Sequence, residues 1–391
     1  MLAGIRYYRS IFPYQYNPQG GPNEAQSRYC IPSPMRPQRH RPHNLPHFQT
    51  LAAFYIWQTM KKTMISIILP ALNEENIILR CLNSISKQKY PRASLEVILA
   101  DANSSDRTTI VARRWSQREK IRLNILTNRM GTLETGNAEY GKAQAIQNSN
   151  GEFICLLDAD NEIVQCDWLT VALRSFDLYP DIFGFESHYL PAPGGPALNN
   201  FLTACLHIDD PLSYSLASRP IEQSRIILGG NVYRKFLAKP VYPTGANGFI
   251  FSRKAITEFI GMPMFEESQV SLMLELKGQA TFCMVDGYGI HHHYVRSWRH
   301  LAAKKKNRAC QHLTRVKTKH TWICAAGRYR LYLHVLLNLS IIHSLLFAVY
   351  KSLRQRSSLW MYWFPSAIFI TTVYILNFCR NNLNRFRRPK T

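Results

Sequence analysis

From residue 64 onward the chain alternates between short apolar runs rich in β-branched residues and longer stretches of helical character. The helical stretches include 76–88 and 106–118, and the apolar runs lie at 64–69, 95–100, 121–126 and 153–157. Alternating strands and helices are typical of a parallel sheet with helices on both faces, and strands covered on both faces are hydrophobic at nearly every position. We therefore expect an α/β fold with a mostly parallel central sheet.

The far end of the chain has a different hydrophobic pattern. Residues 331–350 and 359–378 are two apolar stretches, each of about the length, roughly 20 residues, that crosses a bilayer as a helix. Tyrosine and tryptophan at their ends are typical of membrane–water interfaces. Polar residues such as His334 leave a buried pair of soluble helices as the alternative. We expect residues 329–379 to form a transmembrane helical hairpin.

Lysines and arginines predict the orientation of this hairpin. The tail 380–391 and the stretch before the first span together carry more of them than the segment between the spans, which has Lys351, Arg354 and Arg356. Because basic residues accumulate on the cytoplasmic side of membranes, both ends of the hairpin should be cytoplasmic. We expect a multi-pass protein of the cell inner membrane, or an equivalent membrane, with its α/β domain in the cytoplasm.

Residues 1–59 differ from the rest in composition. They are rich in Pro, Arg, His, Gln and Tyr, contain one acidic residue, Glu24, and show no sustained apolar period. Such composition is typical of disorder. A targeting presequence is the alternative, but the segment has no long apolar core. Translation starting at Met60 would lose no folded element, so this basic tail is either disordered or not native.

The chain is strongly basic, with 48 Lys and Arg against 25 Asp and Glu and a formal charge of +23. This charge suggests nucleic acid, an anionic membrane or a phosphorylated substrate as partner. It gathers in the N-terminal tail and beside the hydrophobic end, which favours lipid headgroups, and no RNA- or DNA-binding motif occurs, so nucleic acid is not expected. Nine irregularly spaced cysteines argue against a disulfide framework and a cysteine zinc site.

Polar residues follow the first two apolar runs. In parallel sheets, ligands bind beyond the carboxyl ends of the strands. Pro70, Asn73 and Glu74 open a helix whose amides can face a base or a phosphate. Asp101 can accept a hydrogen bond from the imide of a uracil ring. Ordinary helix starts and capping explain the same residues, so these segments alone leave both interpretations open.

The fourth apolar run ends in a pair of acids. Asp158 and Asp160 stand at i and i+2 directly beyond it. Two neighbouring carboxylates repel each other unless a cation lies between them. Mg²⁺ or Mn²⁺, shared with substrate phosphates, fits such an oxygen-rich site. The pair therefore predicts a divalent metal that holds a diphosphate.

Four segments occur together in an order and spacing that a known family also shows. They are S-I-I-L-P-A-L-N-E-E at 66–75, L-E-V-I-L-A-D-A-N-S-S-D-R-T at 95–108, G-K-A-Q-A-I at 141–146 and G-E-F-I-C-L-L-D-A-D at 151–160. They resemble the inverting family 2 glycosyltransferases of GT-A fold. The resemblance covers residues 64–165 well and 166–315 loosely.

The resemblance implies a role for each matching position. It assigns the nucleotide to Pro70, Asn73 and Glu74, the base to Asp101, the pyrophosphate to Lys142, the ribose or metal to Asp158, and the metal to Asp160. The family's common D-G-G-S or D-D-G-S turn reads Asp-Ala-Asn-Ser here. The resemblance favours a UDP-sugar as donor, and because of this departure in the turn a GDP-sugar is also possible.

The second half of the chain carries the expected base. Glu267, with Glu266 beside it, falls where the family has an aspartate that deprotonates the acceptor hydroxyl. The extra methylene of glutamate moves the carboxylate by more than ~1 Å, which matters at a catalytic site. Two acids that favour a helix dipole are the structural alternative. A polyprenyl phosphate acceptor, already ionised, would need no strictly placed base.

A run of three histidines, at 291–293, resembles the family position that closes over the metal and diphosphate. Because side chains alternate along a strand, at most His291 and His293 share a face. We expect these two beside the metal. The following basic stretch, 297–308, either clamps the diphosphate or lies on an anionic membrane.

These patterns divide the chain into a disordered or non-native tail (1–59), a GT-A glycosyltransferase domain (60–320), two transmembrane helices (329–379) and a basic cytoplasmic tail (380–391). They predict metal-dependent transfer, with inversion, of a sugar from a nucleotide-sugar donor to a lipid-linked or glycan acceptor near the membrane. The alternative is a non-catalytic nucleotide-sugar-binding scaffold of the same fold.

Overall fold

A computed structural model gives the fold. It describes residues 63–127, 138–207, 210–239, 242, 244–245, 247–257, 278–315 and 327–387. The expected tail 1–59 and the predicted bases Glu266 and Glu267 lie outside these residues.

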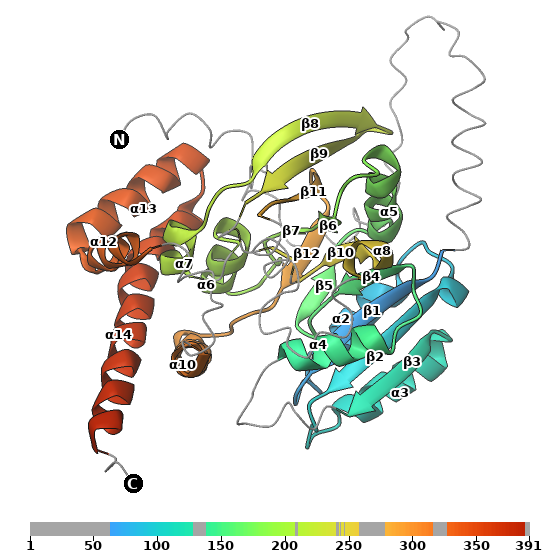
Figure 1. Cartoon of the computed structure of the whole chain (residues 1–391), viewed down its shortest axis with the longest axis horizontal. Helices are drawn as coiled ribbons and strands as arrows, with labels where there is room; N and C mark the ends of the chain where they lie inside the picture. Colours follow the sequence, from blue (N-terminus) through green and yellow to red (C-terminus); the bar gives the residue numbers. More distant parts are fainter. Residues whose placement is uncertain are drawn as a thin grey trace, which may run out of the picture.

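The first half of the main sheet is parallel and begins at the predicted apolar runs (Figure 1). Its strands, in spatial order, are β3 (Arg122–Thr127), β2 (Leu95–Asp101), β1 (Ile65–Ala71) and β4 (Phe153–Leu156). Most buried positions of β1, β2 and β4 are hydrophobic on both faces, as in a sheet covered by helices, with Ser66, Glu96 and Asp101 as buried polar exceptions. The predicted α/β fold is confirmed.

The second half of the main sheet is mixed. Its five strands follow β4 in the order β10 (Phe249–Ser252), β6 (Gly184–Glu186), β11 (Ala280–Val285), β9 (Asn231–Ala238) and β8 (Ile221–Leu228). The strand β10 runs antiparallel to both β4 and β6, β11 is parallel to β6, and β9 reverses again. The parallel character is therefore concentrated in the half that carries the predicted nucleotide residues.

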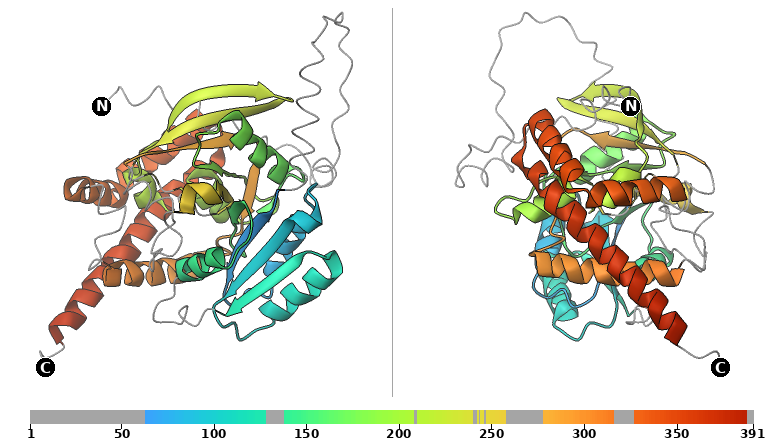
Figure 2. Two further views of the ribbon diagram at one scale, coloured as in Figure 1. Left: turned by 45° about the vertical axis from the view of Figure 1, so that its right-hand side comes forward. Right: turned by 90° about the vertical axis from the view of Figure 1, so that its left-hand side faces the viewer.

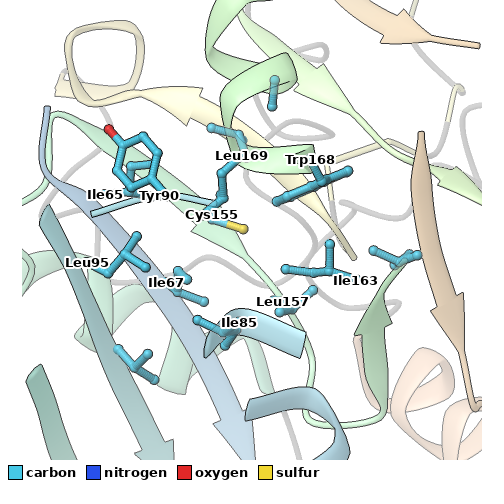
Figure 3. Close-up of a cluster of buried hydrophobic side chains, with 14 of the residues drawn as sticks. Ile65, Ile67, Ile85, Tyr90, Leu95, Cys155, Leu157, Ile163, Trp168 and Leu169 are labelled. Atoms are coloured by element: carbon cyan, nitrogen blue, oxygen red, sulfur yellow. The ribbon is translucent and has the colours of Figure 1, made fainter. Parts of the chain in front are cut away.

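Helices cover both faces of the parallel half. The cluster that includes Ile67, Leu99 and Cys155 packs under α2 (Ile78–Ser86), α3 (Thr108–Glu119) and α5 (Trp168–Leu178). Figure 3 shows side chains of β1, β2 and β4 in this core together with Ile85 of α2 and Trp168 of α5. On the opposite face, Ile68, Ile98 and Leu156 pack against α4 (Ala138–Gln147).

A second sheet of three short strands connects parts of the chain that are far apart in sequence. It orders β5 (Asn161–Ile163), β12 (Gly289–His292) and β7 (His188–Tyr189). The strand β5 begins directly after Asp160, and β12 lies antiparallel beside it. This sheet therefore brings the histidine run to the acid pair.

The remaining helices link the sheets to the C-terminal part. They are the short α6 (Ala197–Asn200), η4 (Phe201–Cys205), α7 (Pro211–Leu216) and α8 (Arg253–Ile256), then α10 (Trp298–Arg315), α12 (Arg328–Leu339), α13 (Ile341–Gln355), η7 (Ser358–Tyr362) and α14 (Trp363–Arg387). Figure 2 shows α12, α13 and α14 spread over one face of the molecule. Trp298 of α10 meets Phe369 of α14 edge to face, with ring centroids 5.3 Å apart.

The first of the two expected transmembrane spans is broken by a bend. Residues 331–350 do not form one helix, because the chain bends by 85° between α12 and α13. Ser340 sits at the bend with φ −69° and ψ 113°, and its hydroxyl accepts a hydrogen bond from the His343 N–H at 3.3 Å. This is the geometry of a helix N-cap, which starts a new helix. Within the described residues, one helix, Ser358–Arg380, is long and apolar enough to cross a membrane, or two if the bent pair counts as one span.

Candidate active site

The loops that follow β1 and β2 are joined by hydrogen bonds. Asn73, in the left-handed region at φ 56°, donates its N–H to the Ser104 hydroxyl at 2.9 Å and accepts the Ser105 N–H on its side-chain oxygen at 2.8 Å. The Glu74 N–H donates to the Thr108 hydroxyl at 2.8 Å. The neighbouring loop therefore uses the amides of Asn73 and Glu74, and contact of these residues with a nucleotide stays a prediction.

Asp101 ends β2 and shapes the turn behind it. It is buried, and it accepts the Ser104 hydroxyl at 2.6 Å and the Ser104 N–H at 3.1 Å. Pro70 lies beside Ala100 in the parallel register of β1 and β2. Contact of Pro70, Asn73 or Asp101 with a nucleotide stays a prediction.

Asp158 forms an ion pair with Lys142. The Lys142 Nζ, almost fully buried on α4, lies 3.0 Å from Asp158 Oδ1. The resemblance placed this lysine near the pyrophosphate and this aspartate at the ribose or metal. The two predicted residues do lie together at the end of β4, on the side of the sheet that α4 covers.

Asp160 is a partly buried carboxylate with two basic neighbours. Its Oδ1 lies 3.4 Å from His292 Nε2, and its Oδ2 lies 3.5 Å from Lys304 Nζ. Burial acts to raise the pKa of Asp160, but His292 and Lys304 together lower it well below the usual range. Asp160 is therefore an anion in the folded protein.

Asn161 orients both acids, and the sequence analysis did not single it out. Its side-chain oxygen accepts the Asp158 N–H at 3.1 Å, and its amide nitrogen donates to Asp160 Oδ1 at 3.2 Å. Asn161 is itself buried. Its position directly after Asp-Ala-Asp was the available signal.

The histidine run faces in two directions. His291 bonds through Nδ1 to the Leu190 carbonyl at 3.1 Å, and His293 lies 3.1 Å from Glu162 and 3.2 Å from Arg80. The middle residue, His292, is the one that meets Asp160. Asn199 of α6 donates to the His292 carbonyl at 2.9 Å and fixes this segment. Metal binding by His291 and His293 stays a prediction, and the geometry adds His292.

Glu74 lies close to the acid pair. Burial and the charge of Asp160 raise the pKa of Glu74 to about 7, against the lowering effect of Lys304 and Arg296. The loop after β1, the end of β4 and the start of α10 thus meet at one place.

The side chains around Asp160 can be compared with the ligands that a divalent ion requires. Across the described segments, no group of three His, Cys, Asp or Glu side chains could hold a metal. Mg²⁺, however, is commonly held by one or two carboxylates plus substrate phosphates. Two ligands at right angles around an ion, each about 2.1 Å away, lie about 3 Å apart, and Asp160 Oδ1 and His292 Nε2 are 3.4 Å apart. This pair fits an ion that substrate oxygens complete.

The acids follow β4 at the edge of a parallel half-sheet, which is where α/β domains bind their ligands. Residues 66–188 match the sequence model of the family described as glycosyl transferase family 2. In this stretch, which is less than half of its length, the chain is similar to that family.

Two relatives each match about a quarter of the chain. "Probable glycosyltransferase YdaM" of Bacillus subtilis is 33% identical over 111 residues, which are 27% of this chain and 25% of the relative. "UDP-Glc:alpha-D-GlcNAc-diphosphoundecaprenol beta-1,3-glucosyltransferase WfgD" of Escherichia coli is 31% identical over 102 residues, 26% of this chain and 37% of the relative. The matched segments thus span well under half of each relative.

A solved structure with a similar arrangement is that of the mannosyltransferase PcManGT from Pyrobaculum calidifontis in complex with GDP-Man and Mn²⁺. It has a TM-score of 0.49 and 16% sequence identity, and the alignment covers 85% of this chain and 95% of that one.

Proposed function

We propose that the protein transfers a sugar, with inversion, from a nucleotide-sugar donor to a lipid-linked or membrane-proximal acceptor. The observation that carries the proposal is the acid pair at the end of β4, where Asp158 is joined to Lys142 and Asp160 to His292 and Lys304. In α/β sheets this edge is where ligands bind. The family match over residues 66–188 includes Lys142, Asp158 and Asp160.

The leaving group of such a reaction is a nucleoside diphosphate, which gains negative charge as the bond to the sugar breaks. Lys142 and Lys304 are the described cations nearest the acids, and either can move from its carboxylate to a phosphate oxygen. Preorganised cations at a site of developing charge stabilise the transition state. Asn161 keeps both acids in place while this happens.

A divalent ion is part of the proposal. Asp160 and His292 would hold Mg²⁺ or Mn²⁺, which would supply positive charge to the diphosphate when bound. UDP-sugars are the favoured donors because the name of the WfgD relative specifies UDP-Glc, and a GDP-sugar is possible. Glu267, with Glu266 beside it, is proposed as the base toward the acceptor.

The same relative's name specifies an acceptor on diphosphoundecaprenol, and the C-terminal helices give this chain a surface for lipid. On α13 the exposed apolar residues form one stripe at helical spacing, namely Ile341, Ile342, Leu345, Leu346, Val349, Tyr350 and Leu353. The opposite side of α13, with Ser344, Ala348 and Lys351, is buried against the protein. A helix with its apolar face outward is suited to a membrane.

We further propose that α12 and α13 lie in the plane of the membrane surface. They have 12 and 15 residues, so at about 1.5 Å per residue neither crosses a hydrocarbon core of about 30 Å. The first part of α14 is also covered by protein, since Trp363, Ala367 and Ile370 are buried. This arrangement replaces the predicted pair of spans with attachment to one leaflet.

The test of the transferase is the incubation of membranes containing the full chain with labelled UDP- and GDP-sugars and Mn²⁺. Asp160→Asn is expected to lower transfer by about 10²-fold or more, the usual effect of removing a group that stabilises developing charge. Asp181→Asn, which changes an exposed aspartate paired with Lys235 on the second half of the sheet, is the matched control. Undiminished transfer by Asp160→Asn would rule out the role given to the acid pair.

A further inference from the structure

A group of buried and partly buried polar side chains lies next to the acid pair and has no part in the chemistry described so far. Its members come from β6, β7 and the loop before β10 and are called here the polar cluster. Glu186, His188 and Thr244 are buried, and Tyr242 and Asn247 are partly buried. Tyr242 donates its hydroxyl to Glu186 Oε2 at 3.3 Å. Buried polar groups at this density usually satisfy one another or bind something.

Two atoms of the polar cluster are shielded from solvent without a hydrogen-bond partner among the described residues. They are His188 Nε2 and the side-chain oxygen of Asn247. An unpaired buried polar atom costs about 1–3 kcal/mol. Such a cost is tolerated where a ligand supplies the missing partner, so both atoms indicate a binding site.

The cluster adjoins the acid pair through the main sheet. The Gly248 N–H donates to the Leu156 carbonyl at 2.8 Å, two residues before Asp158, and Phe249 pairs with Glu186 on its other side. Gly248 has φ +68°, and a Cβ there would lie 2.7 Å from the Ser187 hydroxyl. This close turn holds Asn247 between the end of β4 and the end of β6.

A second connection runs through the small sheet. The ring of Tyr189, next to His188, lies 5.6 Å from the ring of His292, which contacts Asp160. On its other side, Tyr189 stacks on His207 with ring centroids 4.8 Å apart, and His207 lies 6.2 Å from His188. The polar cluster therefore flanks the proposed diphosphate position from two directions.

The chemistry of the cluster suits a neutral ligand. Burial raises the pKa of Glu186 to about 8 and lowers the pKa of His188 to about 4, so both groups are mainly uncharged at neutral pH. Uncharged carboxyl, imidazole, hydroxyl and amide groups donate and accept hydrogen bonds without attracting phosphate. Arg234 and Arg219 act on His188 and Tyr242 through their charge alone, whereas Lys142 and Lys304 are paired with Asp158 and Asp160.

We infer that the polar cluster is the subsite that binds the hydroxyl groups of the donor's sugar ring and selects among sugars. This inference rests on the proposed function, since the sugar is attached to the diphosphate that the acid pair would hold. His188 Nε2 and the side-chain oxygen of Asn247 are the atoms that would bond the sugar hydroxyl groups. Glu186, Tyr242 and Thr244 would form the rest of this subsite. A site that hydrogen-bonds a particular hydroxyl group discriminates strongly against a sugar that lacks this group or carries it in the opposite configuration.

The experiment measures binding of UDP, UDP-glucose, UDP-galactose, UDP-GlcNAc, GDP and GDP-mannose to the full chain by calorimetry with Mn²⁺. His188→Phe keeps a ring but removes both nitrogens. It is expected to weaken binding of the preferred nucleotide sugar by about threefold to tenfold, as the loss of a hydrogen bond does. The affinity for the free nucleoside diphosphate should stay unchanged. The ratio of affinities for UDP-glucose and UDP-galactose should move toward one.

A second variant, Asn247→Leu, tests the inference independently in case the first variant has a folding defect. Ser175→Ala, which removes a buried hydroxyl on the outer helix α5, is the control. Unchanged nucleotide-sugar affinity in both cluster variants would overturn the inference, as would an equal loss for nucleotide and nucleotide sugar. A rise only in the KM for the acceptor would also overturn it. If the wild type binds no nucleotide at all, the proposed function fails together with the inference.

Discussion

At the scale of single residues, Glu186 couples stability to pH. Its folded-state pKa, raised by burial to about 8, lies above the ordinary value of 4.5. The unfolded chain therefore loses this proton first, so the stabilising contribution is complete below about pH 4.5 and is lost as pH rises through about 8. A carboxyl group held in this way favours the folded state only while it is protonated.

Glu186→Gln should remove this pH dependence. We expect the ligand-free variant to melt several degrees higher than the wild type at pH 8, the effect of about 1–2 kcal/mol on a domain of this size, and to show little gain at pH 4.5. Thermal unfolding at both values checks this. An equal difference at the two values would mean that the carboxyl does not titrate as described.

Asp210 is a fully buried carboxylate that connects several helices. It is fully buried with Lys305, whose Nζ lies 3.1 Å away, and it also accepts hydrogen bonds from the Ser213 N–H at 2.6 Å and the Tyr374 hydroxyl at 3.1 Å. One carboxylate thereby caps α7 and joins α10 to α14. Its loss affects three elements at once.

Asp210→Asn should leave the Lys305 cation buried without an opposite charge, which costs about 3–5 kcal/mol when a buried pair is broken. The change is read from chemical or thermal unfolding in detergent. Asp181→Asn removes an exposed partner of Lys235, and a pair of this kind contributes about 0–1 kcal/mol. Similar losses in the two variants would show that the buried pair does not stabilise the fold as proposed.

At the scale of elements, α13 carries an unusual distribution of polarity. Ile342 and Leu353 are 73% and 75% exposed, whereas Lys351 is buried with its Nζ 4.1 Å from the centre of the Trp360 ring. A helix of a soluble protein has the reverse arrangement. The helix α13 is therefore suited to contact lipid hydrocarbon on one side and the rest of the protein on the other.

Ile342→Glu tests this element. Placing a charge in the apolar stripe should abolish flotation of the full chain with vesicles of phosphatidylcholine and phosphatidylglycerol, and it should leave the melting temperature within about 1 °C, because exposed positions contribute little to folding. Ile110→Glu on α3 is the matched control at an exposed isoleucine away from the stripe. Flotation of Ile342→Glu at the wild-type level would exclude α13 as the contact.

At the scale of the whole molecule, the bend at Ser340 decides the route of the chain relative to the membrane. In Figure 2 the three C-terminal helices lie side by side on one face, and the α/β domain lies behind them. A hairpin of two spans would carry the turn before η7 to the far side of the bilayer. Attachment to one leaflet would keep that turn on the side of the active site.

Two cysteines separate these possibilities in sealed vesicles. Arg356→Cys reports the turn and the exposed Cys379 reports the end of α14, each in a background without other reactive cysteines. We expect a membrane-impermeant maleimide to label both from the side that holds the α/β domain. Protection of position 356 alone indicates a hairpin, and protection of Cys379 alone indicates a single crossing by α14.

The sequence alone determined the parallel half of the sheet, the acid pair at its edge and the apolar character of the C-terminal end. These features are local. Runs of β-branched residues, a pair of acids directly after such a run and a stretch of apolar residues act through immediate neighbours. Inspecting the residues that follow strands led to Asp158 and Asp160. The same inspection after the run ending at Phe185 would have led to Glu186 and His188.

The tertiary structure alone decided which side chains meet. His292, and not its neighbours, reaches Asp160 because pairing of β12 with β5 fixes the face of that strand, and strand alternation by itself leaves the face open. Lys304 and Asp210 find their partners across more than ninety residues of sequence. The bend at Ser340 depends on packing, because a serine within an apolar stretch is compatible with both a continuous and a broken helix. Contacts between distant segments follow from the assembled fold, and no local pattern encodes them.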